Sequence, residues 1–342
     1  MSRQCVVGVD LGGTNVRAGA FYQDGREAGE SYSNPSRAQE GTEAIVDAMA
    51  RTILSAVDAS EEKPTAVGLA IPGHIDDERG MVVWAPNFGE TINGVFHYWT
   101  DVPIGKALSE RVGLPVFMGN DANLAALGEY MFGSGKNQAK CLVMLTIGTG
   151  IGGGVVMAPS AVQGDARGPL VLVGANKGGA ELGHVVIAYM GMDCNAGEYG
   201  SIEGYCQRDA IIKRAQHRLR RGRESVLREM LGNDISKLTP KHLDDAADQG
   251  DEVAIEVWEE VGTMLGVGIG NFINIFAPDI VAIGGQIAKS EHWLLRPAIK
   301  EARNVAIPSL FRDAKIQLAE QIDDAGMLGG AALALEAMKW KS

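Results

Sequence analysis

Two short glycine–threonine turns, each between a pair of apolar segments, constrain the fold of this chain more than any other feature. The two occurrences are Val6–Leu11, Gly12-Gly13-Thr14 and Val16–Phe21, and then Cys141–Ile147, Gly148-Thr149-Gly150 and Ile151–Met157. Short apolar runs on both sides of a glycine turn are typical of β-hairpins. The same strand–turn–strand pattern at two places predicts a duplicated α/β architecture with the two hairpins facing each other.

Helical and strand-like patterns alternate along the rest of the chain. Glu40–Val57 and Asp251–Phe276 have helical patterns, and Met327–Met338 is expected to form a terminal helix. Leu114–Met118 and Asp279–Ile283 are short apolar runs that predict buried strands.

The domain organisation follows from length and from the lack of a linker. A chain of 342 residues suffices for about two domains. No stretch rich in proline, serine or charge separates the halves, so we expect closely joined domains with a cleft between them. The expected smaller N-terminal domain covers residues 1–119 together with the C-terminal helix, residues 325–342. The larger domain covers residues 120–324.

Composition and charge exclude several classes of protein. A net charge of −12 and a pI of about 5.0 argue against nucleic acid or an anionic membrane surface as the main partner. The basic run between Lys213 and Arg228 is therefore interpreted as a solvated helix face. Four widely spaced cysteines and no signal-peptide pattern predict a soluble protein of the reducing cytoplasm.

The first glycine turn has the residues of a phosphate site. Gly12 and Gly13 allow a backbone to approach an anion closely, and Thr14 adds a hydroxyl donor. Asp10 would lie beside the phosphates and orient a hydrated Mg²⁺. A plain hairpin turn is the alternative for one such motif alone, but a second glycine–threonine turn and Gly284-Gly285 at a strand end favour the phosphate site. The Walker and Rossmann glycine spacings are both absent.

Two polar segments are candidates for chemistry. Asp121 follows a strand and precedes an apolar helix, so it is either a helix N-cap or a general base held by its neighbour Asn120, and both roles are compatible. Glu181 and His184 lie three residues apart among small residues, which indicates either close packing about a polar ligand or a surface pair.

Taken in order, these motifs resemble the ROK family of sugar kinases, in its bacterial glucokinase-like branch. The resemblance covers nearly the whole chain and rests on six segments: Asp10–Asn15, Ala70–Gly73, Ala85–Asn87, Gly119–Asn123, Thr146–Gly154 and Gly174–His184.

The resemblance implies two duplicated ribonuclease H-like domains of the actin and hexokinase type. It implies ATP and Mg²⁺ as cofactors, phosphorylation of glucose to glucose 6-phosphate, Asp121 as the base, and a homodimer with no nucleic-acid or membrane partner. The implied sugar-binding residues are Gly73, Asn87, Asn120, Glu181, His184 and Glu203. The implied ATP-binding residues are Gly12, Gly13, Thr14, Asn15, Thr146, Gly148, Thr149, Gly284 and Gly285.

One departure from the family pattern concerns zinc. Family members commonly carry a histidine and three cysteines that bind a structural zinc. Here His184 and Cys194 keep their places, but Ala196 and Ser201 occupy the other two cysteine positions. Two ligands do not make a closed tetrahedral site, so we predict no structural zinc. The loop that presents Glu203 must then be held by packing or hydrogen bonds, with Tyr199 as a candidate.

Several alternatives stay open at this stage. The sugar could be mannose, fructose, N-acetylmannosamine or N-acetylglucosamine, and the phosphoryl donor could be polyphosphate. A catalytically silent sugar sensor is the non-enzyme alternative. Family repressors carry a helix-turn-helix domain before the first glycine motif, which starts at residue 10 here, so we expect no such domain. The long segment Ala158–Val173 is interpreted as a surface flap or an oligomer contact.

Overall fold

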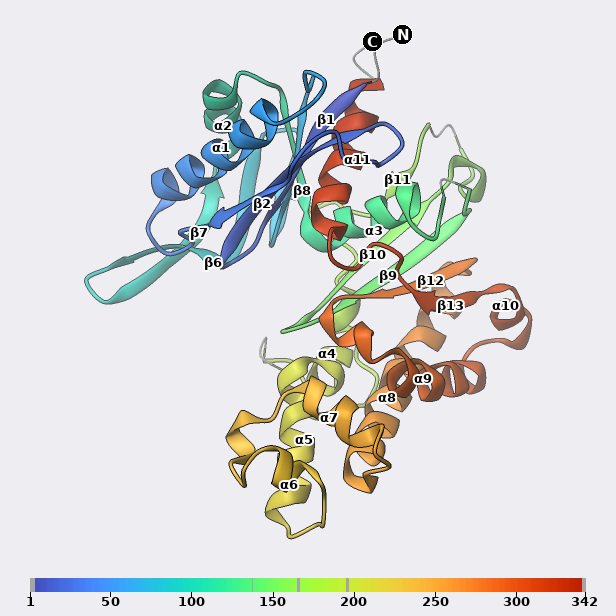
Figure 1. Cartoon of the computed structure of the whole chain (residues 1–342). Coiled ribbons are helices and arrows are strands. Elements are labelled where there is room, and N and C mark those ends of the chain that lie inside the picture. The colour runs from blue at the N-terminus through green and yellow to red at the C-terminus, as the bar shows by residue number, and fades with distance from the viewer. Residues whose placement is uncertain (1–3, 137, 165–166, 195–196, 340–342) are drawn as a thin grey trace. The chain divides into compact units, whose positions relative to one another are not determined.

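A computed structural model describes residues 4–136, 138–164, 167–194 and 197–339 (Figure 1). The chain divides into two compact units. The first unit is built from the chain up to residue 140, residues 154–180 and the chain from residue 323 onward, and the second from residues 141–153 and 181–322. The boundary predicted after residue 119 lies inside the first unit, which also contains the C-terminal helix.

The first unit is organised around a five-stranded sheet. Its strand order is β3 (Tyr32–Pro35), β2 (Asn15–Tyr22), β1 (Cys5–Leu11), β4 (Val67–Ile71) and β8 (Val116–Asn120). Strands β1 and β2 form the antiparallel hairpin that the first glycine turn predicted. Strands β1, β4 and β8 are parallel, so their carboxyl ends share one edge of the sheet.

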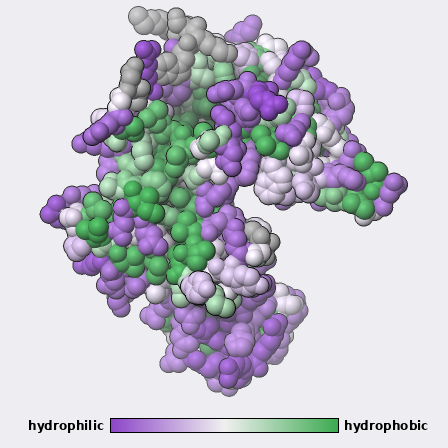
Figure 2. Space-filling view, turned by 180° about the vertical axis from the view of Figure 1, so that it is seen from behind, coloured by the Kyte–Doolittle hydropathy of each residue, from purple (hydrophilic) through white to green (hydrophobic). Residues whose placement is uncertain are grey.

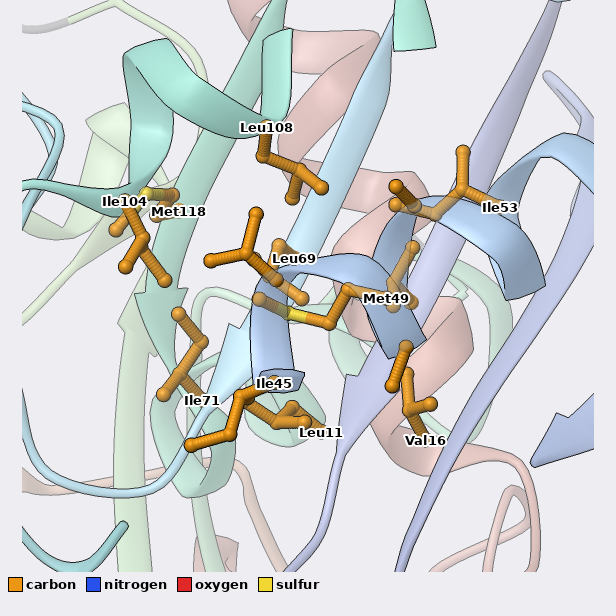
Figure 3. Packing of buried hydrophobic residues seen from close by; sticks show 14 of the residues in the cluster. Leu11, Val16, Ile45, Met49, Ile53, Leu69, Ile71, Ile104, Leu108 and Met118 are labelled. Atoms are coloured by element: carbon orange, nitrogen blue, oxygen red, sulfur yellow. The ribbon is translucent and has the colours of Figure 1, made fainter. Parts of the chain in front are cut away.

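Helices α1 (Thr42–Asp58) and α2 (Ile104–Val112) supply one hydrophobic core of this unit. Figure 3 shows how side chains of the two helices and of the strands interlock in it, and its labelled members are Leu11, Val16, Ile45, Met49, Ile53, Leu69, Ile71, Ile104, Leu108 and Met118. Successive residues of a strand face opposite sides of the sheet, so strands buried on both sides read as continuous apolar runs.

Helix α11 (Ala325–Lys339) packs on the sheet and on helix α3 (Asp121–Phe132) through glycines. A Cβ added at Gly8 would lie 1.9 Å from the carbonyl oxygen of Met327, and one at Gly68 would lie 1.8 Å from that of Gly330. No side chain fits there, so these glycines are required for the helix to lie against the strands. Residues 340–342 of the predicted helix lie outside the described residues.

A three-stranded sheet of β5 (His74–Asp76), β6 (Met81–Ile92) and β7 (Val95–Val102) was not predicted. The pairing of β6 with β7 shifts register between Ala85 and Gly89. Exposed apolar side chains lie near the turn of this hairpin, including Ile92 and Val95, where Figure 2 shows a hydrophobic patch.

The second sheet repeats the order of the first. Its strands are β11 (Leu170–Val171), β10 (Ile151–Met157), β9 (Cys141–Ile147), β12 (Ile280–Gly284) and β13 (Lys315–Leu318). Strand β12 pairs in parallel with β9 and β13, as β4 does with β1 and β8. The predicted duplicated α/β architecture is therefore confirmed. Within the predicted 158–173 segment the structure has β11 and a short helix, η1 (Pro159–Ala161), and residues 165–166 lie outside the described residues.

Helix α8 (Glu252–Phe276) is the central helix of the second unit. Asp251 caps it by accepting a hydrogen bond from the N–H of Ala254 at 2.9 Å. Gly262, Gly266 and Gly270 lie against α9 (Glu291–Val305), whose atoms would collide with an added Cβ at each position. The remaining helices are α4 (Ile202–Cys206), α5 (Arg208–Arg220), α6 (Leu227–Met230), α7 (Pro240–Ala247), α10 (Pro308–Asp313), η2 (Leu182–His184), η3 (Ile235–Lys237) and η4 (Gln286–Ser290).

Acidic residues of α8 form ion pairs with arginines of the basic run between Lys213 and Arg228. Arg223 forms an ion pair with Glu256 at 2.9 Å, and Arg218 pairs with both Glu256 and Glu260. The hydrogen bond from Arg223 is the main cause that lowers the pKa of Glu256. Figure 2 shows this helical part of the second unit as a predominantly hydrophilic surface. Arg218, Arg223, Glu256 and Glu260 thus form a local ion-pair network.

Two further properties bear on the sequence expectations. Within the described ranges, no helix combines the length and the apolar character that crossing a membrane requires. All four cysteines are buried free thiols. Burial raises the pKa of Cys141 and of Cys206 to about 12, so neither thiol is a nucleophile near neutral pH.

A buried carboxyl on α7 generates a testable pH dependence. Burial raises the pKa of Asp244 to about 6, although Ser290 donates a hydrogen bond to its Oδ2 at 2.7 Å. The ordinary aspartate pKa is about 3.9, so the folded chain binds the proton more tightly than the unfolded chain. The stabilisation that the protonated Asp244 gives the folded state is therefore lost as pH rises through about 6, and the free energy of unfolding falls by that amount.

We expect Asp244→Asn to remove this pH dependence, because asparagine has no charge to desolvate. The Tm of the variant minus that of the wild type should be higher at pH 8 than at pH 4.5, by roughly 2–6 °C in differential scanning calorimetry. Asp245→Asn is the control, because Asp245 pairs with Lys241 at 3.0 Å and is more exposed. An equal Tm difference at both pH values would contradict the prediction.

Candidate functional site

The candidate residues of the first unit lie where parallel strands end. Asp10 pairs with Ala70, and Ile71 pairs with Asn120, so Asp10, Gly73 and Asp121 follow the same edge of the sheet. Carboxyl ends of parallel strands are the usual place for a ligand in an α/β sheet. The sequence segments that were separate predictions are thus brought together within this unit.

Asp10 lies against the first turn of α11. A Cβ added at Gly326 would come within 2.5 Å of the carboxyl carbon of Asp10. Burial raises the pKa of Asp10, the nearby Arg17 lowers it, and Asp324 raises it again. Arg17 itself forms an ion pair with Asp324. A half-buried carboxyl at this position suits a bound cation, which would stabilise its charged form.

Gly13 and Gly148, one in each glycine–threonine turn, border open space. An added Cβ at either position would meet nothing within 4 Å, and neither residue has a left-handed φ. Other glycines with similar space around them, such as Gly113, Gly222 and Gly250, have φ values of +69° to +84°, which account for glycine there. Neither packing nor backbone conformation explains glycine at 13 and 148, and the space suits a ligand that contacts the backbone.

Asn120, and not Asp121, caps helix α3. The Oδ1 of Asn120 accepts a hydrogen bond from the N–H of Asn123 at 3.0 Å, and its Nδ2 donates to the carbonyl of Gly73 at 3.0 Å. Asp121 is the first helical residue, half-buried, and its Oδ1 accepts from the N–H of Ala122 at 2.8 Å. The helix N-terminus favours an ionised carboxylate at this position.

Two further positions of the first unit were implied as sugar-binding. Gly73 has φ +114°, and a Cβ there would lie 2.1 Å from the carbonyl oxygen of Trp84, so both conformation and contact require glycine. Asn87 is exposed in the irregular part of β6, between Ala85 and Gly89. A strand irregularity of this kind turns a side chain out of the regular ladder.

In the second unit, Glu203 joins helix α4 to the second glycine turn. Its Oε2 accepts a hydrogen bond from the N–H of Ile151 at 2.8 Å, and Glu203 is only 8% exposed. Gly150 makes room for it, since an added Cβ would lie 2.7 Å from this oxygen. Ser201 caps the helix by accepting from the N–H of Gly204.

The third glycine motif lies beside the second turn. Gly284 at the end of β12 pairs with Thr146 in β9. Gly285 has φ +84°, and a Cβ there would lie 2.4 Å from the carbonyl oxygen of Ile147. Thr149 follows Gly148, whose N–H donates to the carbonyl of Gly150 at 2.9 Å. Thr14 and Asn15 stand in the corresponding turn of the first unit, where the N–H of Gly12 donates to the carbonyl of Asn15 at 2.9 Å.

His184 has two carboxylates beside it. Its Nδ1 lies 2.7 Å from Glu198, and its Nε2 lies 4.0 Å from Glu181. Sequence reasoning singled out Glu181 but missed Glu198, which reads as a surface residue in the sequence. Tyr199 is 64% exposed, and the tyrosine that contacts the loop is Tyr205, whose hydroxyl accepts from the N–H of Met192 at 3.0 Å.

The described residues near His184 differ from the donor set of a closed structural zinc site. Donor atoms of His184, Cys194 and Glu203 lie within 4.8 Å of one another, and a Glu198 oxygen lies 2.7 Å from Nδ1 of His184, so two of these donors are carboxylates. A structural zinc takes four, usually thiolates and imidazoles. The Glu203 oxygen already accepts the N–H of Ile151, and the Ser201 hydroxyl caps α4. Ala196, at another of the family's cysteine positions, lies outside the described residues.

Comparison with known proteins identifies relatives along the whole chain. The model of the ROK family matches residues 6–337. The glucokinase of Thermotoga maritima is 35% identical over 98% of this chain and 99% of its own length. A ROK family glucokinase from Streptomyces griseus, solved in complex with glucose and AMPPNP, is 30% identical with a TM-score of 0.78, covering 97% of this chain and 99% of that one. The actin/hexokinase-like two-domain fold is thereby shown.

Regulators also occur among the relatives. A xylose repressor from Caldicellulosiruptor bescii is 26% identical over 97% of this chain and 78% of its own length. The glucokinase relatives are more similar than this repressor, and together the matches support a sugar kinase.

We expect the purified full chain to retain well below one zinc ion per chain after dialysis, because the described donors include one thiol and one imidazole, whereas structural zinc sites are built from four thiolates and imidazoles. Inductively coupled plasma mass spectrometry on protein purified without chelators measures this directly. A stoichiometric zinc that survives dialysis would contradict the prediction.

Proposed function

Because the chain belongs to the ROK family, we propose that it is an ATP-dependent hexose kinase that converts glucose to glucose 6-phosphate. In this reaction the sugar hydroxyl loses a proton and attacks the terminal phosphorus of ATP, and ADP leaves. Little covalent chemistry is required of the protein, so catalysis is mostly positioning and charge stabilisation.

The position of Asp121 is the observation that carries the proposal. It stands at the carboxyl edge of three parallel strands, and the helix cap is provided by its neighbour. The sequence left capping and general base as compatible roles. Asn120 provides the cap, and we propose that the Asp121 carboxylate, one oxygen of which accepts the N–H of Ala122, is the base. An ionised carboxylate can accept the hydroxyl proton as the phosphoryl group transfers.

The glycine turns support the phosphate side of the proposal. Open space at Gly13 and Gly148 suits phosphate oxygens that contact backbone N–H groups. We propose that Gly12, Thr14 and Asn15 complete the first turn. On the second turn the proposed contacts are Thr146, Thr149, Gly284 and Gly285. Asp10 would orient Mg²⁺, whose charge offsets that of the phosphates.

The proposed sugar contacts are the backbone of Gly73 and the polar side chains of Asn87, Asn120, Glu181, His184 and Glu203. A hexose presents only hydroxyls, so a site built to pair each one rejects an epimer whose hydroxyl leaves a buried group unpaired. Glu203 uses one carboxylate oxygen for Ile151 and has a second for a hydroxyl. Glucose is the first choice because relatives that are 34% and 35% identical to this chain are named glucokinases.

A sugar-binding regulator is the second candidate, favoured by the repressor relatives. A kinase for mannose, fructose or an N-acetylhexosamine, or one that uses polyphosphate, keeps the same mechanism.

We expect strong ATP- and Mg²⁺-dependent ADP release with glucose in a coupled assay across a panel of these sugars. Turnover with another sugar alone would change the substrate, and no turnover with any sugar and either donor would favour the regulator.

Substitution of Asp121 tests the base. General-base catalysis typically contributes about 10²–10⁴-fold to the rate. Asp121→Asn should therefore lower kcat by at least about 10²-fold while Tm stays unchanged. Asp209→Asn is a matched control, because Asp209 is an acidic residue in the first turn of another helix, α5. Turnover of the Asp121 variant near that of the wild type would remove Asp121 from the mechanism.

Substitution of the open glycines tests the phosphate turns. Gly13→Ala and Gly148→Ala should raise the KM for ATP roughly tenfold with little change in Tm, because the methyl group enters ligand space and not the core. Gly250→Ala gives the opposite pattern, since its φ of +81° is strained for alanine: a lower Tm and an unchanged KM. Unchanged KM for ATP in both turn variants would argue against phosphate binding there.

A further inference from the structure

The imidazole of His184 is held on one side by the Glu198 carboxylate. The distance from Nδ1 of His184 to Oε2 of Glu198 is 2.7 Å, which is short for a nitrogen–oxygen hydrogen bond. The same oxygen accepts the Cys194 thiol at 3.7 Å. His184 is 28% exposed, so its ring is partly enclosed.

The chemistry of this contact fixes the position of a proton. A glutamate carboxylate near neutral pH has lone pairs and no donor, so each partner at hydrogen-bond distance must donate to it. In a neutral imidazole one nitrogen carries the proton and the other is an acceptor. Contact with Glu198 therefore places a proton on Nδ1 of His184. In the neutral ring this leaves the lone pair on Nε2, which lies 4.0 Å from the Glu181 carboxylate, beyond hydrogen-bond distance.

Main-chain hydrogen bonds hold the loop that carries Glu198. The N–H of Cys194 donates to the carbonyl of Glu198 at 2.9 Å, and the N–H of Gly197 donates to the carbonyl of Cys194 at 3.0 Å. The N–H of Gly200 donates to the carbonyl of Met192 at 2.7 Å, which closes the loop. None of these bonds uses the Glu198 side chain, so that side chain is available to hold His184.

We propose that Glu198 is a positioning residue: it holds His184 as the Nδ1–H tautomer, so that Nε2 presents a lone pair to a hydroxyl donor. The identity of that donor, a sugar hydroxyl, rests on the proposed function, but the tautomer does not. A carboxylate thus orients the histidine in a loop whose described donors include one thiol. Without Glu198 the ring would be free to turn and to move its proton to Nε2, where it would repel a donor.

The tautomer is measurable by long-range ¹H–¹⁵N correlation spectra of the ¹⁵N-labelled full chain at pH 8.5. Each of the six histidines gives its own pattern, and His184→Gln assigns the signal of interest. His242 is an internal reference for the opposite tautomer. Its Nδ1 accepts the N–H of Thr239 at 3.2 Å, so its proton lies on Nε2. We expect Nδ1–H for His184 and Nε2–H for His242.

Two variants isolate the carboxylate from the thiol. Glu198→Ala should shift His184 away from the Nδ1–H pattern and leave His242 unchanged. Cys194→Ala removes the neighbouring thiol and should keep the Nδ1–H pattern of His184. An Nε2–H or doubly protonated His184 in the wild type would overturn the proposal, as would an unchanged pattern in Glu198→Ala or a metal-bound nitrogen signal that a chelator removes.

Kinetics test the positioning role. Glu198→Ala should raise the KM for the sugar by roughly 3–10-fold, with kcat and the KM for ATP within about twofold of the wild type. Glu198→Gln keeps an acceptor oxygen, so its KM for the sugar should lie between that of the wild type and that of Glu198→Ala. An unchanged sugar KM despite an altered tautomer would overturn the positioning role. If the wild-type chain turned over no sugar, the proposed function would fail, while the spectra would still decide the role of Glu198.

Discussion

The parallel register of β1, β4 and β8 is the constraint on which the candidate site of the first unit depends. It brings Asp10, Gly73 and Asp121 to one edge of the sheet although they are far apart in the sequence. A shift by one residue would turn each strand's side chains to the opposite face of the sheet. Close packing of α11 against Gly8 and Gly68 makes such a shift costly, because any side chain at either position would collide with the helix backbone.

The high glycine content therefore has two physical origins, and only the structure separates them. Gly8, Gly68 and Gly262 are contact points where a helix meets a strand or another helix, and a Cβ there would collide with the neighbour. Gly13 and Gly148 border open space with ordinary φ values, so neither the core nor the turn geometry requires glycine there. The sequence does not distinguish glycines in close packing contacts from glycines that border open space, because it does not show which atoms lie next to each one.

Strong local patterns could be predicted from the sequence, and long-range side-chain contacts could not. The two glycine hairpins, helices α1 and α8 and the paired strands followed from periodicity and turn residues. Hairpin β6–β7 was missed because Pro86 and the register shift interrupt its alternation. Asp121 could be read as a cap or a base, and the choice depends on where the side chain of Asn120 points. Likewise Glu198 reads as a surface residue until its carboxylate is seen at Nδ1 of His184.

In the second unit, the Glu203 and Glu198 carboxylates each add one side-chain hydrogen bond to the main-chain hydrogen bonds of the loop that carries Glu198. A hydrogen bond to a charged group contributes about 1.5–3 kcal/mol, whereas a structural zinc contributes about 10–16 kcal/mol to a small domain. A loop held by carboxylates is therefore far easier to open than one held by a metal. Its residues Tyr189 and Met190 are largely exposed, so little burial opposes such opening. On the proposed function, a sugar bound to His184 and Glu203 would therefore supply part of the order of this loop.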